Sequence, residues 1–178
     1  MYQEGQKGGK MAIRKIREYG DAVLTKPCKE VREMTDRVRE LIEDLIDTMY
    51  EENGVGLAAP QVGVLKRVVV IDTTGEGPIV MINPEILETS GTQTGHEGCL
   101  SVPGKCGIVT RPDYVKAKAR NEAFEEFEIE GEGLLARAIC HELDHLNGKL
   151  YVDLVEGDLL ETSALEEDED EAYEFRIE

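Results

Sequence analysis

The segment EGLLARAICHELDHLN, residues 132–147, combines a helical pattern of apolar residues with two of the three histidines in the chain. Its apolar residues recur at steps of three and four, which is the spacing of one face of an α-helix. Gly148 follows the segment and is placed to end the helix. The repeating apolar residues are Leu134, Leu135, Ala138, Ile139, Leu143 and Leu146.

HELDH, residues 141–145, is the polar motif of this expected helix. His141 and His145 are four residues apart, so they lie one turn above each other and can point both imidazoles at one metal ion. Glu142 stands beside the first histidine, where its carboxylate can reach a metal-bound water without binding the metal. A general base in metal-assisted hydrolysis needs this position. The alternative is a pair of unrelated helix histidines beside a surface glutamate.

A catalytic divalent metal usually takes three protein ligands and keeps one position for water, so HELDH needs a further ligand. Cys99 lies in EGCLS, residues 97–101, next to a glycine that allows close approach of the backbone. Its thiolate would complete a Cys-His-His set, whereas Glu97 is noted only as a member of the motif. Asp144 and Ser101 are candidates for fixing the orientation of the ligands, with solvated or capping roles as the alternative.

Two other classes of protein stay open at this point. A fourth ligand from His96, Cys106 or Cys140 would close the site, and the metal would then only stabilise the fold. A zincin-type metallopeptidase shares the His-Glu-x-x-His motif but takes its third ligand further along the chain. There the sequence supplies only acidic residues such as Glu161 and Glu166.

A third informative segment is GVGLAAPQVG, residues 54–63. Its small residues satisfy a loose dinucleotide-binding spacing, but that motif must follow a strand and open a helix. Here the segment follows a helical pattern and leads into RVVVID, so the nucleotide interpretation fails on context. The glycines instead allow close backbone approach, and the Gln61 amide could donate a hydrogen bond to a developing oxyanion.

The remaining patterns predict an α+β fold with mostly antiparallel β-sheet pieces packed around a central HExxH-bearing helix. A second, N-terminal amphipathic helix is expected from Thr35 or Asp36 to a stop at Gly54. Its apolar residues are Val38, Leu41, Ile42, Leu45, Ile46 and Met49. The expected strands are 67–72, 78–82, 107–110, 114–119 and 124–129, separated by the turn-forming segments TTGEGP, TSGTQTG and RPD.

Length and charge bound the classes of function. A chain of 178 residues with net charge −18 is expected to hold one core and to have no direct affinity for nucleic acid. We expect a disordered leader at 1–10, a single catalytic metallohydrolase domain at 11–155 and an acidic C-terminal tail at 156–178. With no long apolar run and no signal peptide, the expected location is the cytoplasm, away from membranes.

GVGLAAPQ, EGCLS and HELDH together resemble the three motifs of the peptide deformylases, in the same order. That family removes the formyl group from N-formylmethionine on newly made proteins, releasing formate, and the resemblance covers about residues 11–155. It implies that Cys99, His141 and His145 are the metal ligands and that Glu142 is the catalytic acid and base. It also implies one divalent ion, for which iron(II) is expected ahead of zinc, nickel or cobalt. The enzyme would act in N-terminal processing of nascent peptides and would contact the ribosome transiently.

The resemblance also assigns the groups around the substrate. Gln61 and the backbone N–H of Leu100 look like the donors to the oxyanion, and Gly56 lies where the family's backbone holds the substrate chain. The methionine side chain needs an apolar pocket. We expect Val55, Leu100, Leu134 and Ala138 to line it, with core packing as the alternative for Leu134.

Overall fold

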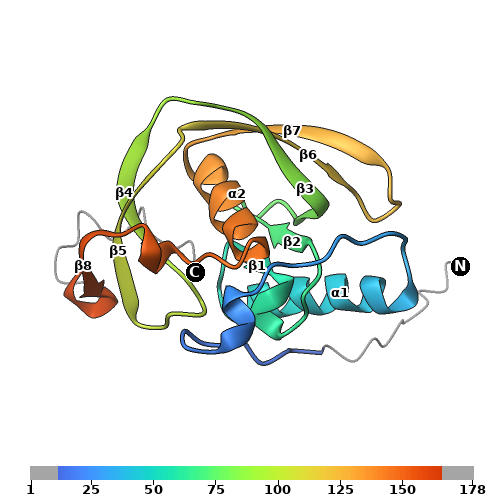
Figure 1. Ribbon diagram of the computed structural model, residues 1–178, viewed down its shortest axis with the longest axis horizontal. Coiled ribbons are helices and arrows are strands. Elements are labelled where there is room, and N and C mark those ends of the chain that lie inside the picture. The colour runs from blue at the N-terminus through green and yellow to red at the C-terminus, as the bar shows by residue number, and fades with distance from the viewer. Residues whose placement is uncertain (1–11, 166–178) are drawn as a thin grey trace, which may run out of the picture.

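The computed structural model describes residues 12–165, which form two α-helices and eight β-strands (Figure 1). The α-helices are α1 (Asp36–Glu51) and α2 (Gly133–Leu146). The described chain also has four short 3-10 helices: η1 (Ala22–Thr25), η2 (Ala59–Val62), η3 (Tyr151–Asp153) and η4 (Thr162–Ala164). The strands are β1 (Gly56–Ala58), β2 (Val68–Ile71), β3 (Ile79–Ser90), β4 (Gln93–Gly98), β5 (Lys105–Arg111), β6 (Tyr114–Arg120), β7 (Glu126–Glu132) and β8 (Glu156–Glu161).

The strands form two sheets in which every neighbouring pair is antiparallel. One sheet has the order β1-β2-β3-β6-β7, and the other has the order β4-β5-β8. Helix α2 contacts β1, β2, β6 and β7 of the larger sheet and β5 of the smaller one. In Figure 1 the long strands β3, β6 and β7 arch over α2, and β4 and β5 stand at its side. A mixture of helix and antiparallel sheet, as the sequence predicts, is therefore confirmed.

Strand β2 lies between the two helices because its residues alternate in direction. Val69 and Ile71 belong to the same buried cluster as the apolar face of α2, whereas Val68 and Val70 belong to the cluster that includes α1. All four side chains are fully buried. A strand covered on both faces reads as an unbroken apolar run, which explains the sequence VVVI.

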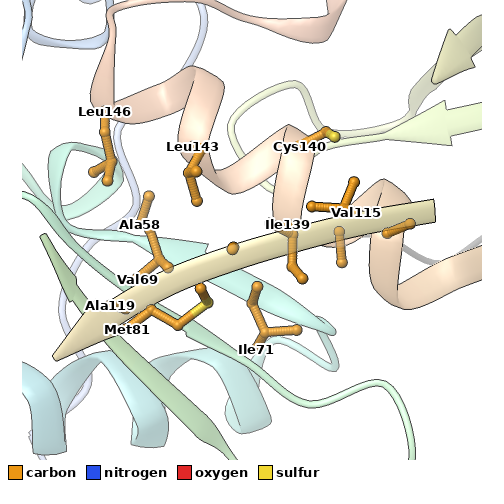
Figure 2. Packing of buried hydrophobic residues seen from close by; sticks show 13 residues of the cluster. Ala58, Val69, Ile71, Met81, Val115, Ala119, Ile139, Cys140, Leu143 and Leu146 are labelled. Carbon is orange, nitrogen blue, oxygen red and sulfur yellow. The ribbon is translucent and has the colours of Figure 1, made fainter. Parts of the chain in front are cut away.

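Figure 2 shows the cluster that fixes the position of α2. Ile139, Leu143 and Leu146 point from the helix toward the strand residues Ile71 and Met81. Burying an aliphatic side chain of this size contributes about 1.5–3 kcal/mol relative to leaving it exposed. The apolar face of α2 is therefore held by the larger sheet, and its polar face is turned elsewhere.

The ends of both helices follow the expected chemistry, with one difference. The Thr35 hydroxyl accepts a hydrogen bond from Val38 N at 3.2 Å and caps α1. At the other end of α1 the left-handed residue is Asn53, with φ 57°, and not the following glycine. Asn tolerates this conformation, so the stop comes one residue earlier than predicted. Gly148, with φ 72°, ends α2 as predicted.

The largest differences from the predicted strands are in the exposed parts of the sheets. Strand β3 continues to Ser90, well past the expected end at residue 82, and leads directly into β4. The second half of β3 is largely exposed and pairs with β6. Such a segment is stabilised by main-chain hydrogen bonds and leaves little apolar pattern in the sequence.

The boundary predicted at residue 155 falls short. Glu156–Glu161 form β8, which pairs with β5, and all six residues are exposed. An exposed strand edge needs no apolar residues, so the sequence resembled a tail. The predicted leader at 1–10 and the acidic residues from 166 onward lie outside the described residues. None of the helices within 12–165 is long and apolar enough to span a membrane.

Candidate metal centre

Three potential ligand atoms meet beside α2. Cys99 comes from the turn after β4, and His141 and His145 come from successive turns of α2. The Cys99 Sγ lies 3.4 Å from His145 Nε2, which lies 3.2 Å from His141 Nε2. All three side chains are buried, and their ligand atoms lie within 4.8 Å of one another.

These distances fit one tetrahedral ion. A nitrogen ligand lies about 2.0–2.1 Å from zinc and a thiolate about 2.3 Å. At tetrahedral angles two such nitrogens are about 3.3 Å apart, and a nitrogen and a sulfur about 3.6 Å apart. Two of the three separations, 3.2 Å between the imidazoles and 3.4 Å between His145 and Cys99, agree with these values, and all three atoms lie within 4.8 Å of one another, so the donor set fits one ion. A thiolate with two imidazoles suits iron, zinc, nickel or cobalt.

The ligand group contains only three residues within the described part of the chain. His96, Cys106 and Cys140, which could have closed the site, do not belong to it. Glu161, the downstream ligand expected of a zincin, is exposed and forms an ion pair with Lys105 instead. The other downstream candidate, Glu166, lies outside the described residues. Three protein ligands on a tetrahedral ion would leave its fourth position for water, as in catalytic sites.

The two imidazoles differ in electrostatic environment. Burial by itself would lower the pKa of His141, but hydrogen bonds to Cys99 and Glu97 outweigh it and raise this pKa well above the usual value. Burial, with the neighbouring charge on His141, lowers the pKa of His145 well below the usual value. One site therefore holds one imidazole that favours the charged form and one that favours the neutral form.

Glu142 lies at the same place with its carboxylate buried. Burial raises its pKa to about 7, and the nearby charge of His141 opposes this rise. Its Oε2 is buried without a hydrogen-bond partner among the described residues. A Cβ atom added to Gly56 would stand 2.6 Å from Glu142 Oε1, so any larger residue there would force this carboxylate to move. The structure thus gives Gly56 a contact with Glu142 that the sequence did not suggest.

The amide of Gln61 is fixed in orientation by its neighbours. Its Oε1 accepts a hydrogen bond from Ala58 N at 2.9 Å. Its Nε2 consequently faces the metal centre, 3.1 Å from Ser101 Oγ and 3.5 Å from Cys99 Sγ. Leu100, the other predicted donor, directly follows the cysteine and is half-buried.

The N-terminal segment joins the two loops that carry these groups. Arg17 N donates to the carbonyl of Gln61, and Tyr19 N donates to the carbonyl of Ser101, each at 2.7 Å. Both contacts use main-chain atoms alone. The loop around η2 and the turn after β4 are therefore held by one extended stretch of chain.

The four residues predicted to line an apolar pocket are not brought together as one group. Val55 and Ala138 pack in the cluster beneath α2, and Leu100 packs against the cluster of α1. Leu134 is 38% exposed and lines a separate hollow with Tyr114 and Glu130. It lies in the first turn of α2, about two turns before His141, and its place in the pocket for the methionine side chain stays a prediction.

The sequence missed a buried ionic network behind His141. His141 Nδ1 lies 2.8 Å from Glu97 Oε2, and the same carboxylate accepts hydrogen bonds from Arg111 and Arg137. Arg111 also binds Asp144, one of the predicted orienting residues. Arg137 stands four residues before His141, and this spacing on one helix face was the signal available in the sequence.

An open Cys-His-His group beside a buried carboxylate is the arrangement that mononuclear metal hydrolases use. Residues 13–158 match the sequence model of the family described as polypeptide deformylase. The chain belongs to this family, and it is an enzyme of the hydrolase class.

Relatives of known name or structure agree with this assignment. A peptide deformylase of Agathobacter rectalis is 68% identical over 149 residues, which is 84% of this chain and 94% of that one. A peptide deformylase of Lachnoclostridium phytofermentans is 60% identical, over 90% of this chain and all of that one. The crystal structure of a peptide deformylase from Legionella pneumophila superimposes with a TM-score of 0.79 at 48% identity, covering 82% of this chain and 87% of that one.

Proposed function

We propose that this chain removes the N-formyl group from the N-formylmethionine of nascent polypeptides by metal-dependent hydrolysis and releases formate. The observation that carries the proposal is the meeting of three ligand atoms, within 4.8 Å of one another, beside the buried Glu142. Deformylation of nascent peptides is the activity of the family to which the chain belongs.

Cys99, His141 and His145 would hold one divalent ion, with iron(II) proposed ahead of zinc, nickel or cobalt. Helix α2, which presents both imidazoles, is in this proposal the central catalytic helix of the fold. When bound, the ion supplies a Lewis acid that makes a bound water more acidic and polarises the formyl carbonyl. The thiolate of Cys99, as the third ligand, would add negative charge to the ligand set.

Glu142 moves the protons of the reaction in this proposal. Its pKa of about 7 suits a group that accepts a proton from the attacking water and then returns it to the departing amine. Its Oε2 has no hydrogen-bond partner among the described residues, so this oxygen is available to the water. The methionine amine and formate are the products.

Gln61 and the backbone N–H of Leu100 stabilise the negative charge that develops on the formyl oxygen. The hydrogen bond from Ala58 N to Gln61 Oε1 supports this role, because it turns the amide N–H groups toward the site before substrate arrives. The main chain at Gly56 holds the substrate peptide in this proposal. The apolar surface for the methionine side chain comes from Val55, Leu100, Leu134 and Ala138.

The place of action that we propose is the cytoplasm, where nascent chains emerge, with a transient contact to the ribosome. A net charge of −18 would repel RNA phosphates. Any such contact therefore rests on the nascent peptide or on ribosomal proteins and not on direct binding of nucleic acid.

The deciding experiment is an anaerobic assay of the iron-loaded protein on a formyl-methionyl peptide and on its acetylated analogue. We expect formate from the first peptide and no cleavage of the second. Release of internal peptide fragments instead would favour a metallopeptidase, and no turnover of either peptide by metal-loaded protein would contradict the proposal.

The ligand set is tested by Cys99→Ala. Loss of a ligand should lower metal affinity by more than the 10–100-fold that is typical of residues behind the ligands. Metal content after dialysis measures this, and Cys28→Ala, a half-buried thiol outside the ligand group, is the control. Full metal retention by Cys99→Ala would show that the third ligand lies elsewhere, as in a zincin.

A further inference from the structure

We propose that Arg137 is a positioning residue for the metal centre. In this inference Arg137 and Arg111 together hold Glu97 against His141, so that the imidazole keeps the orientation in which its Nε2 faces the metal. The inference rests on the proposed metal site. It assigns a role to a residue that lies outside all three motifs.

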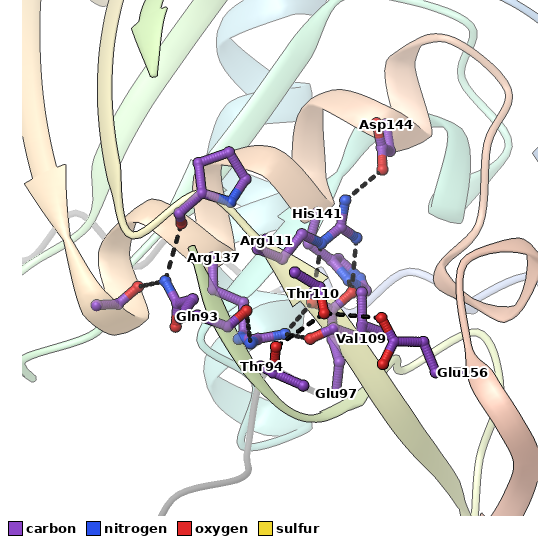
Figure 3. Close-up of polar contacts among 12 residues, drawn as sticks. Gln93, Thr94, Glu97, Val109, Thr110, Arg111, Arg137, His141, Asp144 and Glu156 are labelled. Atoms are coloured by element: carbon purple, nitrogen blue, oxygen red, sulfur yellow. Dashed lines mark hydrogen bonds and ion pairs between the residues drawn. The ribbon is translucent and has the colours of Figure 1, made fainter. Parts of the chain in front are cut away.

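The Glu97 carboxylate is saturated with donors, as Figure 3 shows. Its Oε1 accepts from Arg111 Nε at 3.1 Å and from Arg137 Nη1 at 3.0 Å. Its Oε2 accepts from Arg111 Nη2 at 2.7 Å and lies 2.8 Å from His141 Nδ1. A carboxylate offers about four acceptor positions, and here four donors occupy them. The carboxylate therefore has no freedom to turn away from the imidazole.

A carboxylate held in its charged form can only accept a hydrogen bond. Arginine side chains can only donate hydrogen bonds, and three of their N–H groups, two from Arg111 and one from Arg137, point at Glu97. The proton of the fourth contact consequently lies on His141 Nδ1, so Nε2, which lies 3.2 Å from His145 Nε2, is the nitrogen that would lose its proton and bind the ion. A hydrogen bond of this kind behind a histidine ligand fixes both its tautomer and its ring orientation.

Arg137 adds contacts to the main chain of the sheet, which Arg111 does not make through its hydrogen bonds to Glu97 and Asp144. It starts from α2, and its guanidinium also donates to the carbonyl of Val109 at 3.1 Å and to the carbonyl of Gln93 at 3.5 Å. These two carbonyls belong to β5 and β4. Arg137 therefore ties the helix that carries the histidines to the sheet that carries Glu97, with a side chain that is only 6% exposed.

Among the carboxylates and guanidinium groups of the network, charges balance only when Arg137 is present. Glu97 and Asp144 contribute two negative charges, and Arg111 and Arg137 contribute two positive charges. Without Arg137, one of the two donors to Glu97 Oε1 is lost, and so is one cation. An under-compensated buried charge is unfavourable, and the carboxylate can then rotate toward water.

Arg111 itself should stay in place when Arg137 is replaced. It binds Asp144 at 2.6 Å independently of Arg137, and it still contacts both oxygens of Glu97. The fold should consequently survive the substitution, while the hold on His141 weakens. This separates a positioning role from a role in folding alone.

The experiment compares Arg137→Met and Arg137→Lys with the wild type. The probe is cobalt(II), followed by its rate of release to a chelator and by the cobalt–thiolate absorption band. We expect 10–100-fold weaker cobalt affinity and a shifted band for Arg137→Met, as is typical when a residue behind a ligand is lost. Arg137→Lys keeps the charge but not the fork of donors, so it should recover the affinity in part.

Arg67→Met is the matched control. Arg67 also binds α2, through the carbonyl of Leu146 and the side chain of Asn147, but it has no contact with Glu97 among its hydrogen bonds. It should lower the melting temperature without changing the cobalt release rate or the band. A change equal to that of Arg137→Met would overturn the inference, because any loosening of α2 would then suffice.

The inference also fails if Arg137→Met melts earlier than the wild type but releases cobalt at the wild-type rate with an unshifted band. If Arg137→Met does not fold, Arg137→Lys is judged by the same criterion. A wild-type protein that binds no stoichiometric cobalt would instead refute the proposed metal site, so the two failures are distinguishable.

Discussion

Helices α1 and α2 are both amphipathic, yet they serve different purposes. Helix α1 buries an apolar stripe and only one charged residue, Asp44, while its other charged side chains face solvent. Helix α2 buries an apolar stripe and, on its other faces, four ionisable residues. These are Arg137, His141, Glu142 and His145. The apolar pattern alone does not distinguish the two cases, whereas the position of the charges does.

The buried ionisable side chains of α2 lower the stability of the fold. Removing ionisable groups from water is unfavourable unless each is paired or binds a metal. The ionic network behind His141 compensates part of this cost, but Glu142 Oε2 and His145 Nδ1 remain without partners among the described residues. Unpaired buried atoms on α2, beside three converging ligand atoms, indicate that function and not stability selected these side chains.

The largest expected effect comes from removing the buried carboxylate of α2. Glu142→Ala should keep its metal and lose roughly 10²–10⁴-fold in kcat, about 2.7–5.5 kcal/mol in barrier height, because no group remains to transfer the proton. Glu43→Ala, an exposed glutamate of α1, is the control and should leave kcat unchanged. Steady-state kinetics with metal analysis measures both. An active Glu142→Ala enzyme would remove the functional distinction between the helices.

A smaller effect is expected where the backbone approaches Glu142. Gly56→Ala places a Cβ 2.6 Å from Glu142 Oε1, and such overpacking costs about 1–3 kcal/mol of stability. Chemical denaturation measures this loss. In the double variant with Glu142→Ala the clash disappears, so the two effects should not add. Additive losses would mean that Gly56 is required for another reason.

The smallest effect concerns the first turns of the two helices. Thr35→Ala removes the hydrogen bond to Val38 N and should destabilise the protein by about 1 kcal/mol without changing kcat. Glu132, at the same position of α2, makes no capping hydrogen bond with its side chain. Glu132→Ala should therefore stay within about 0.5 kcal/mol of the wild type. Equal losses in thermal denaturation would contradict this difference.

The sequence predicts those parts of the molecule in which side chains repeat with a period. The apolar spacing predicts the bounds of both helices to within a few residues. The spacing in HELDH predicts that two histidines lie one helical turn apart. The partners of Glu97 could not be predicted in this way, because Arg111 and Arg137 come from separate elements and meet only after the chain folds.

The exposed strands could not be predicted for another reason. Strand β8 has no buried residue, and the last residues of β3 are exposed as well. What holds them is hydrogen bonding between main-chain atoms, which every sequence except proline can supply. Leu134 shows a related limit: its helical spacing fits a buried core residue and a pocket residue equally, and the spacing does not reveal that 38% of the side chain is exposed.

The segment around Arg17 and Tyr19 clasps the loops of Gln61 and Ser101 through peptide groups only. These two contacts therefore do not depend on which side chains stand at positions 17 and 19, provided that no proline removes an N–H. The length of the segment is not free, because shortening it by a residue or two would pull both loops out of register at once. Substitution of the exposed Tyr19 side chain should therefore be silent in this enzyme, whereas small deletions in the segment should reach the reaction centre.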